Sequence, residues 1–591
     1  MSPSKASTLF ALLLAAALPA PAVELPDPVP VRLIGINDFH GTLEAIPGTT
    51  LSLADPGAVP GAPPLRVPVG GAPALAGMVK RLRAGSPYSL MLAGGDLVGA
   101  APLVSSLFRH ESTIEILNDV GLEVSTFGNH EFDAGRTELE RLIRGGCARN
   151  VPENPTTSCA RGPYRGARFT YLGTNVVNAS DRPIAAPYVI KQFAGIPVAI
   201  IGGVTKTTPQ LVMPSGIAGL RFLDEADAVN RAADELRAKG VRAMVAVFHE
   251  GIELGTEANP GDWNDTTCPE AHGPLLDIAR RLAPEIRVVF SGHTHKGYRC
   301  EVGGRLLMQS TSHGRGISVV DVLLDRSTGA MLPPVRSINL PLVADGTDPA
   351  LRERVAAGTP APFAAVLREA KADGAIAAKV AEYAKLVKPK AAQPVGFIGG
   401  TFLRGPRQES RTDRVDSPAG RLVADAQLAA TRNLGAQISF MNPAGIRTPL
   451  VCATPPCPIT FGQVFNMQPF GNSLVVMTFT GAQLKALLES QSLTDERNLA
   501  QPSAGFTYTW KTDEPQGQRV RDMMLDGMPI EPGRNYRVTV NSFMAEGGDG
   551  FVLLKDGTNR TGGGQDLDAI VAYLGSATRI PVAEPRINRL P

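Results

Sequence analysis

A layered α/β fold with two or three domains is predicted by three features of the sequence. The chain has 591 residues, which is more than one hydrophobic core usually serves. Apolar residues make up 43% of it and aromatic residues only 5%, a composition typical of globular proteins. From residue 30 to about residue 340, short apolar runs alternate with stretches of helical periodicity, and strands separated by helices favour a layered α/β domain.

The chain begins with a predicted signal peptide, residues 1–22. Lys5 gives a positive start, residues 9–18 form a short apolar run, and Ala20-Pro21-Ala22 offers a small-x-small cleavage site. The alternative, an N-terminal anchor, is disfavoured because the run is too short to span a membrane. The mature protein is therefore expected to be periplasmic or secreted, soluble after cleavage and without stable membrane insertion.

Charge and cysteine usage fit that compartment. The formal net charge is +2 without a basic run, so nucleic acid is not expected as a partner, while the choice between monomer and dimer stays open. Proximity in sequence suggests the disulfides Cys147–Cys159, Cys268–Cys300 and Cys452–Cys457. Six cysteines allow 15 arrangements, so the sequence does not fix these pairs. A zinc–thiolate site is the weaker alternative, because no C-x-x-C pair is present.

The first domain is predicted over residues 28–345. Its expected elements are a strand from Ile34, a helix over 73–83, a strand over 89–92, an amphipathic stretch over 103–120, and strands over 168–172, 197–201, 243–248 and 287–290. Two insertions, 49–71 and 145–165, are expected to be surface loops.

A helical linker is predicted over residues 346–392, where Ala, Lys, Glu and Arg dominate and Lys388-Pro389-Lys390 closes the helix. The alternative is a helix that belongs to the first domain. Residues 393–591 then form a second α/β domain, with a helix over 419–431 and strands over 437–441, 474–479 and 536–540.

Five of the eight histidines fall at the ends of apolar runs or just beyond them, beside Gly, Asp or Asn: His40, His130, His249, His293 and His295. Asp38 and His40 are two residues apart, so in an extended segment both side chains point to one face and can share a cation. A lone histidine of this kind is usually structural. Because open α/β sheets gather ligands outside the carboxyl ends of their strands, the group as a whole indicates one crevice with a two-metal site.

Four motifs occur in order: Asp-x-His-Gly from Asp38, Gly-Gly-Asp ending at Asp96, Gly-Asn-His-Glu-Phe-Asp from Gly128, and Ser-Gly-His-Thr-His from Ser291. Together they resemble the calcineurin-like metallophosphoesterase superfamily. The resemblance implies a four-layer α/β/β/α domain that hydrolyses phosphoric esters with two divalent ions.

Asp96 is the candidate bridging ligand, because an anionic carboxylate can bind two cations and offset their repulsion. The other predicted ligands divide into Asp38, His40 and His295 for one ion and Asn129, His249 and His293 for the other, as in the family's pattern. Oxygen and imidazole ligands suit zinc, manganese, cobalt or iron, and the sequence does not choose among them.

His130 and Asp133 lie three residues apart, where one helical turn can bring the carboxylate to the ring. The resemblance implies that this pair stabilises the transition state and assists the leaving group. The alternative is a helix N-terminal cap with an acidic first turn.

Three loops of the second domain, 441–447, 468–472 and 543–551, resemble the C-terminal domain of the 5′-nucleotidase family. The resemblance implies a base clamp, a ribose contact, a base-edge contact and an anion site, the candidate residues being Phe470, Phe543, Asp549, Asn442, Gly445 and Arg447. Core packing is the alternative for both phenylalanines. At the position where relatives place an arginine this chain has Asp413, so Arg411 and Arg414 are the candidate replacements.

The sequence therefore predicts an exported dinuclear phosphohydrolase that releases phosphate from nucleoside 5′-monophosphates by attack of hydroxide formed at the metals. The alternatives are a 2′,3′-cyclic-nucleotide phosphodiesterase or a UDP-sugar hydrolase on the same scaffold. A catalytically inactive binding protein is a further alternative, disfavoured because every expected ligand is present.

Overall fold

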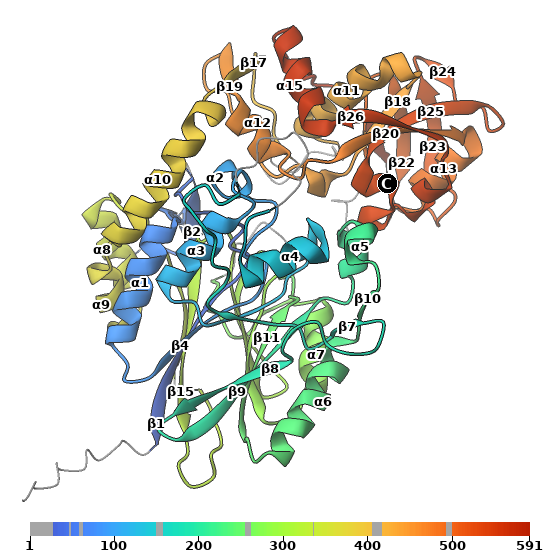
Figure 1. Ribbon diagram of the computed structural model, residues 1–591. Helices are drawn as coiled ribbons and strands as arrows, with labels where there is room; N and C mark the ends of the chain where they lie inside the picture. The colour runs from blue at the N-terminus through green and yellow to red at the C-terminus, as the bar shows by residue number, and fades with distance from the viewer. Residues whose placement is uncertain are drawn as a thin grey trace, which may run out of the picture.

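The computed structural model describes residues 28–46, 49–57, 63–148, 158–254, 262–334, 336–404, 416–491 and 499–590. The expected signal peptide and the candidate arginines Arg411 and Arg414 lie outside these ranges. Two α/β domains are seen in Figure 1, one coloured blue to lime and the other orange to red, with the yellow helix α10 (Gly374–Ala391) running from the first to the second.

The first domain contains two six-stranded sheets. The order of the first sheet is β16-β15-β1-β4-β5-β6, with β1 (Val29–Ile36), β4 (Ser89–Ala93), β5 (Val124–Thr126), β6 (Thr170–Leu172), β15 (Gly316–Leu324) and β16 (Arg336–Pro341). The order of the second is β13-β14-β12-β11-β9-β8, with β8 (Tyr188–Phe193), β9 (Ile196–Val204), β11 (Ala243–His249), β12 (Ile286–Phe290), β13 (Gly297–Val302) and β14 (Arg305–Ser310).

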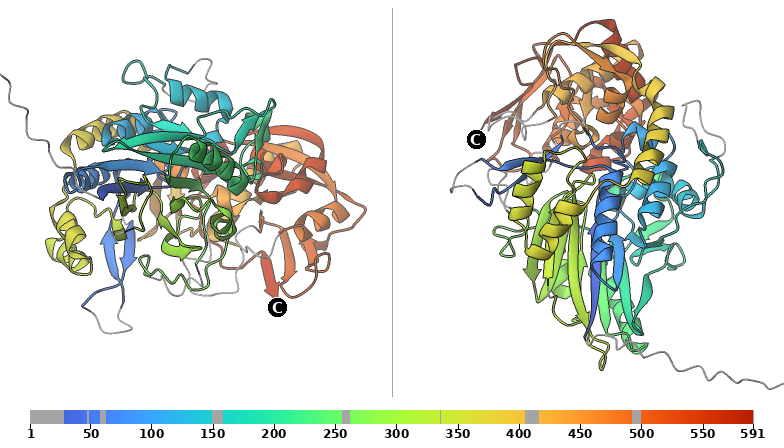
Figure 2. Two further views of the ribbon diagram at one scale, coloured as in Figure 1. Left: turned by 90° about the horizontal axis from the view of Figure 1, so that it is seen from below. Right: turned by 90° about the vertical axis from the view of Figure 1, so that its left-hand side faces the viewer.

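Successive side chains of β1 point alternately to the two faces of the first sheet, and this shows how the layers form. Leu33 faces the second sheet in a core that also holds Leu90 and Val245, whereas Ile34 and Met91 face the opposite way. The helices α1 (Ala72–Ala84), α3 (Glu111–Val120) and α4 (Gly135–Arg144) cover the outer face of the first sheet, and α6 (Glu225–Ala238) and α7 (Pro274–Arg281) cover that of the second. This arrangement confirms the predicted four-layer α/β/β/α fold, and Figure 2 shows the molecule from two further directions.

The parallel strands place the site. β1, β4, β5 and β6 run parallel in the first sheet, and β9, β11, β12 and β14 run parallel in the second. The carboxyl ends of parallel strands lie at one edge of a sheet. The loops that follow β1, β4, β5, β11 and β12 carry the candidate metal ligands, and the contacts reported below show that they meet at this edge.

The region expected to be one helical linker forms three helices, α8 (Pro349–Ala357), α9 (Ala361–Glu369) and α10. Phe363, Leu367 and Tyr383 are buried in the core of the first domain, against α1 and α3. Pro389 was expected to close the last helix but lies inside it, because so near the C-terminal end a proline disrupts only one hydrogen bond of the final turns.

One other expectation was wrong. The 49–71 insertion contains a hairpin, β2 (Thr50–Leu53) paired antiparallel with β3 (Leu65–Pro68), rather than loop alone. The amphipathic stretch 103–120 forms two helices, α2 (Leu103–Ser106) and α3. They are separated because His110 takes a left-handed backbone with φ 65° and its Nδ1 pairs with the Ser105 hydroxyl at 2.9 Å.

The second domain holds a five-stranded sheet and a four-stranded one. The five-stranded sheet has the order β21 (Gln501–Pro502), β18 (Ile438–Met441), β25 (Asn535–Asn541), β20 (Ser473–Thr480) and β26 (Thr558–Gln565). The four-stranded sheet has the order β24 (Met528–Pro529), β23 (Val520–Leu525), β22 (Phe506–Lys511) and β27 (Ile587–Leu590). Helices α11 (Pro418–Thr431), α12 (Phe461–Met467), α13 (Gly481–Glu489) and α15 (Asp566–Ser576) pack around them. The strands and the helix predicted here are present within two residues.

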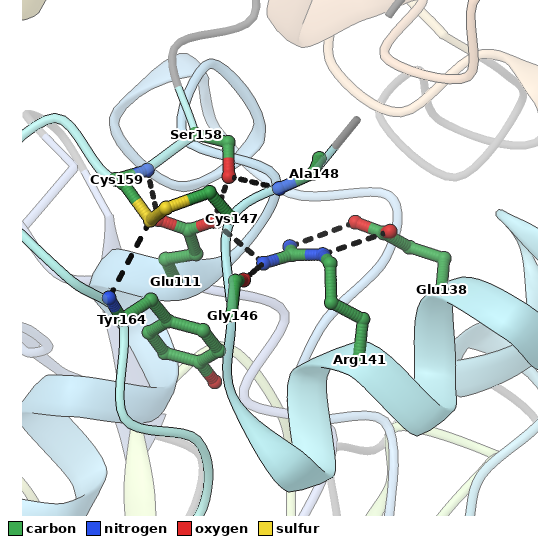
Figure 3. Close-up of a disulfide and its surroundings, with 9 residues drawn as sticks. All are labelled: Glu111, Glu138, Arg141, Gly146, Cys147, Ala148, Ser158, Cys159 and Tyr164. Carbon is green, nitrogen blue, oxygen red and sulfur yellow. Dashed lines mark hydrogen bonds and ion pairs between the residues drawn. A yellow bond between two sulfur atoms is a disulfide. The ribbon is translucent and has the colours of Figure 1, made fainter. Parts of the chain in front are cut away.

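All three predicted disulfides are formed, and no described helix is long and apolar enough to cross a membrane. Figure 3 shows the Cys147–Cys159 pair beside the first residue of α3, Glu111. Glu111 is only 3% exposed and accepts hydrogen bonds from Arg141 Nη1 at 2.7 Å, from the Ser158 hydroxyl, and from the backbone N–H of Cys159 at 2.6 Å. This carboxylate therefore joins α3, α4 and the disulfide.

We expect Glu111→Gln to lower the free energy of unfolding by about 2 kcal/mol, because an amide leaves buried donors without an acceptor. Chemical denaturation of the oxidised protein measures the change. Glu140→Gln is the matched control on α4, because Glu140 pairs with Arg136 at the surface, where such a pair contributes about 0 to 1 kcal/mol. Equal losses in both variants would contradict the role of Glu111.

Candidate metal centre

Five of the seven predicted metal ligands sit on left-handed backbone. The φ angles are 47° at Asp38, 46° at His40, 50° at Asp96, 74° at His293 and 59° at His295. Outside glycine this conformation costs about 1 to 2 kcal/mol per residue, although Asp and His are among the types that tolerate it best. Such strain concentrates at functional sites, where the surrounding structure over-determines it.

The first set of candidate ligands forms one cluster. Ligand atoms of Asp38, His40, Asp96 and His295 all lie within 4.8 Å of one another. Nε2 of His40 is 3.2 Å from Nε2 of His295, which in turn is 3.4 Å from Asp38 Oδ1. This spacing brings an anionic oxygen and two imidazole nitrogens around one point, which is a candidate site for a divalent metal.

The second set meets the first at Asp96. Asp96 Oδ2 lies 3.6 Å from His40 Nε2 and 3.1 Å from His249 Nε2. Asn129 Oδ1 lies 3.0 Å from His249 Nε2 and 3.1 Å from His293 Nδ1. The structure thus brings all seven side chains together, with the Asp96 carboxylate between the two sets.

Backbone contacts orient two of these rings. Nδ1 of His40 is 2.9 Å from the carbonyl of Gly99, and Nδ1 of His249 is 2.7 Å from that of Gly94. A carbonyl accepts only, so in the neutral form of each ring Nδ1 carries the proton and Nε2 presents a lone pair to the cluster. This orientation of histidine ligands is common in metal sites.

Electrostatics at the centre favour a cation. Burial alone would raise the pKa of Asp96, but the imidazoles of His249 and His130 outweigh it and hold that pKa well below the usual range. Burial would lower the pKa of His249, yet the Asp96 carboxylate raises it to about 10. Because metal ligands must give up their protons, a bound cation would replace the proton that Asp96 attracts to His249.

The predicted pair of His130 and Asp133 is in contact. His130 Nδ1 is 2.8 Å from Asp133 Oδ2, and the His130 backbone N–H donates to Asp96 Oδ1 at 2.9 Å. Burial opposes protonation of His130, but the carboxylates of Asp133 and Asp96 raise its pKa overall. The short helix η1 (His130–Phe132) has no side-chain cap, so Asp133 serves the ring rather than the helix end.

Sequence reasoning missed two residues that hold the ligand loops. Glu131, inside the Gly-Asn-His-Glu-Phe-Asp motif, accepts from the backbone N–H groups of Asp96 at 2.9 Å, Leu97 at 2.8 Å and Gly128. Asn37 donates to Asp38 Oδ2 at 2.7 Å, while its Oδ1 accepts from the backbone and hydroxyl of residue 310. The sequence did offer one signal for these residues, because Asn37 directly precedes Asp38 and Glu131 lies two residues after Asn129.

Side chains of the second domain reach this centre. The ring of Phe470 stacks on that of His130, with centroids 5.9 Å apart and planes at 24°. The Arg447 guanidinium lies 5.9 Å from the Phe470 ring. Its positive charge contributes to the lowered pKa values of His40 and His295, although burial is the main cause for both.

The remaining predicted pocket residues form a second contact group. Asn442 donates to Asp549 Oδ2 at 2.7 Å and accepts from the Asn541 amide at 2.8 Å. Gly445 is buried, and a Cβ there would lie 2.9 Å from Asn442 Oδ1, so a side chain would displace that amide. Phe543 packs on Gly548, one residue before Asp549.

Asn472 links the loops that carry the two phenylalanines. Its Oδ1 accepts from the Ser542 hydroxyl at 3.3 Å, and its carbonyl accepts from the backbone N–H of Asp566 at 2.9 Å. Asp566 is 2% exposed, and burial raises its pKa to about 7. A titratable carboxyl therefore lies just behind the candidate clamp.

Comparison with known proteins agrees with both halves of this arrangement. Residues 31–297 match the calcineurin-like phosphoesterase family and residues 395–556 match the 5′-nucleotidase C-terminal domain. The chain is 31% identical over 95% of its length to Endonuclease YhcR of Bacillus subtilis, of which it spans only 41%. It is 30% identical over 93% of its length to Cell wall protein Lmo0130 of Listeria monocytogenes, of which it spans 67%.

The crystal structure of a 5′-nucleotidase precursor from Thermus thermophilus is similar over nearly the whole chain. The TM-score is 0.70 at 27% sequence identity, with 95% of this chain and 99% of that chain covered. The relation between the two domains is thus shared with a solved structure.

We expect Asp566→Asn to change how stability depends on pH. An aspartate with a folded-state pKa near 7, against about 3.9 when unfolded, stabilises the fold below pH 4 and loses this contribution as the pH rises to 7. The free energy of unfolding of the variant should match that of the parent at pH 4. At pH 8 it should be higher by a few kcal/mol, since one pKa unit corresponds to about 1.4 kcal/mol.

Urea denaturation between pH 4 and 8 tests this expectation. Asp568→Asn, two residues further along and on the exposed side of α15, is the matched control. Its charge is only the smallest of the named causes that raise the pKa of Asp566, so its removal should change the pH dependence much less. If Asp566→Asn follows the parent throughout, the carboxyl does not titrate in this range.

Proposed function

Because the chain belongs to the 5′-nucleotidase family of calcineurin-like phosphoesterases, and is thus a hydrolase, we propose that it releases phosphate from nucleoside 5′-monophosphates with two divalent ions. One observation carries the proposal: Phe470 and Arg447 of the second domain lie against His130 and the ligand cluster of the first. A nucleotide bound between the domains would have its base near the clamp and its phosphate near the cluster.

The residues present fit two ions that share Asp96. Asp38, His40 and His295 would hold one, and Asn129, His249 and His293 the other, through oxygen and nitrogen donors without thiolate. When bound, such a pair supplies an acidified water as nucleophile and neutralises charge on the phosphoryl oxygens. Zinc, manganese, cobalt and iron all suit these donors.

The chain's own side chains would handle the proton and the negative charge. Asp133 fixes Nδ1 of His130 and favours the protonated ring, so Nε2–H can donate to the phosphoryl group or to the departing 5′ oxygen. Arg447 adds a fixed positive charge on the side of the second domain, where its fork of donors can bind the phosphate.

Nucleoside recognition is assigned to the second domain. Phe470 and Phe543 would hold a base between their rings, and base stacking on an aromatic residue contributes about 1 to 3 kcal/mol. Asp549 and Asn442, already joined by a hydrogen bond, would bind the ribose hydroxyls and the base edge. Arg411 and Arg414 remain candidates for the missing arginine contact.

We place this activity outside the cytoplasm, in the periplasm or secreted. Three disulfides support export, because such bonds persist in oxidising compartments. The predicted leader at residues 1–22 would direct it. 2′,3′-Cyclic nucleotides and UDP-sugars remain alternative substrates, and an assay with AMP, 2′,3′-cyclic AMP and UDP-glucose side by side decides among them.

We expect Asp96→Asn to abolish hydrolysis of AMP and to lower the metal content of the purified protein. His130→Ala should retain the metal and lose about 10²- to 10⁴-fold in kcat, the usual contribution of a positioned acid–base group. Phosphate release and elemental analysis measure both effects. His272→Ala, at an exposed histidine, is the control. Full activity in either active-site variant, or in excess chelator, would refute the proposed mechanism.

Replacing Phe470 with alanine should raise KM for AMP by about 10-fold or more, because one stacking contact is lost. KM for p-nitrophenyl phosphate, which has no base, should change much less. Phe397→Ala removes a half-exposed ring of the same domain and should leave both constants unchanged. Equal effects of Phe470→Ala on the two substrates would argue against a base clamp.

A further inference from the structure

A strained loop joins the two sheets directly beside the metal ligands. Residues 311–315 connect β14 of the second sheet to β15 of the first. Thr311 has φ 69°, His313 has φ 55° and Gly314 has φ 60°. Left-handed backbone is a genuine outlier for a β-branched residue such as threonine, and strain of this kind persists only where the surroundings impose it.

The strained loop is held by the segment after β1, which carries Asp38 and His40. The Asn37 amide donates to the Thr311 carbonyl, and the His313 backbone N–H donates to the Asp38 carbonyl at 2.7 Å. These contacts hold the loop against the end of β1, so its side chains are placed by the same backbone as Asp38 and His40.

The imidazole of His313 packs on two candidate ligands. Its ring centroid is 5.0 Å from that of His40, with planes at 27°, and 5.3 Å from that of His295, with planes at 83°. The ring is only partly buried. Arg447 of the second domain is close enough for its charge to act on the ring. His313 therefore borders the space between the first ligand set and the nucleotide-binding domain.

Hydrogen bonds from the same loop hold one ring nitrogen of His313. Its Nδ1 lies 2.8 Å from the Ser312 hydroxyl, and Arg315 Nη2 lies 2.8 Å from the same oxygen. A guanidinium can only donate, so the serine oxygen accepts from Arg315, and its own hydrogen is free to point at Nδ1. With the hydroxyl turned this way, the proton of the neutral ring is on Nε2, and we take this tautomer below.

We propose that His313 is a further substrate-contacting residue, whose Nε2–H donates a hydrogen bond to a phosphoryl oxygen on the side of Asp38, His40 and His295. This inference rests on the proposed function and adds a donor opposite His130. Ser312 and Arg315 are positioning residues, because Ser312 holds Nδ1 of His313 and Arg315 holds the Ser312 hydroxyl. A preorganised donor aimed at developing charge is the kind of group that lowers a phosphoryl-transfer barrier.

Two substitutions separate hydrogen bonding from packing. His313→Phe keeps a flat ring against His40 but has no donor, and His313→Gln places an amide N–H near the former Nε2. With metal content unchanged, His313→Phe should lose about 10²-fold in kcat for AMP. It should also bind inorganic phosphate about 10- to 100-fold more weakly by calorimetry of the metal-loaded protein, the value of a hydrogen bond to a charged group. His313→Gln should recover most of both losses.

His272→Phe is the matched control, because His272 is exposed, and it should behave as the parent. Parental phosphate affinity and kcat in His313→Phe would overturn the proposal, as would equal losses in His313→Phe and His313→Gln. Either result, together with inactivity of Asp96→Asn and His130→Ala, would refute only the role of His313. Retained activity in Asp96→Asn would instead refute the proposed function itself.

Discussion

The structure depends on a carboxylate that is buried in the middle of a ring of bases. Asp96 is 1% exposed, and a second buried carboxylate, Asp38, lies close to it. The repulsion between the two negative charges makes it harder for both groups to be ionised. A pair of buried anions is costly unless positive charge compensates it. His249 and His130, whose pKa values are raised by Asp96 among other groups, supply that compensation. His249 comes from the second sheet and His130 from the first, so both sheets must present their carboxyl edges to the same space.

Holding these side chains in place requires backbone that most residues avoid. The ligand loops turn sharply as they leave buried strands, and Asp and His occupy positions where glycine would be the usual choice. Glu131 and Asn37 offset this strain, since each satisfies several backbone or side-chain groups of different ligand loops. The rigid cores on both faces of each sheet supply the rest of the support, because the strands cannot shift without opening packed layers.

Much of this was predictable because it is local in sequence. Strand ends followed by Gly, Asp and His, the spacing of His130 and Asp133, and cysteines close along the chain all encode contacts over short separations. Contacts between distant segments were not predictable in the same way. Nothing local marks His313 as a neighbour of His40, because they are brought together by the antiparallel pairing of β1 with β15.

The same distinction applies to the second domain. Its loop motifs indicated candidate pocket residues, but the stacking of Phe470 on His130 depends on how the whole domain sits over the first. The hairpin in the first insertion was missed for a related reason, since it is decided by the pairing of two strands. The break at His110 likewise depends on a single backbone angle that periodicity does not encode. Propensity gives way to tertiary context at such points.

Each disulfide described here closes a loop of 5, 12 or 32 residues inside one domain, and none bridges the pair. Disulfide cross-links are therefore confined to the separate domains, and the contacts of Phe470 and Arg447 described above are non-covalent. Disulfide formation can stabilise each domain without fixing one domain against the other. A change in the angle between the two domains would therefore strain none of these three bonds.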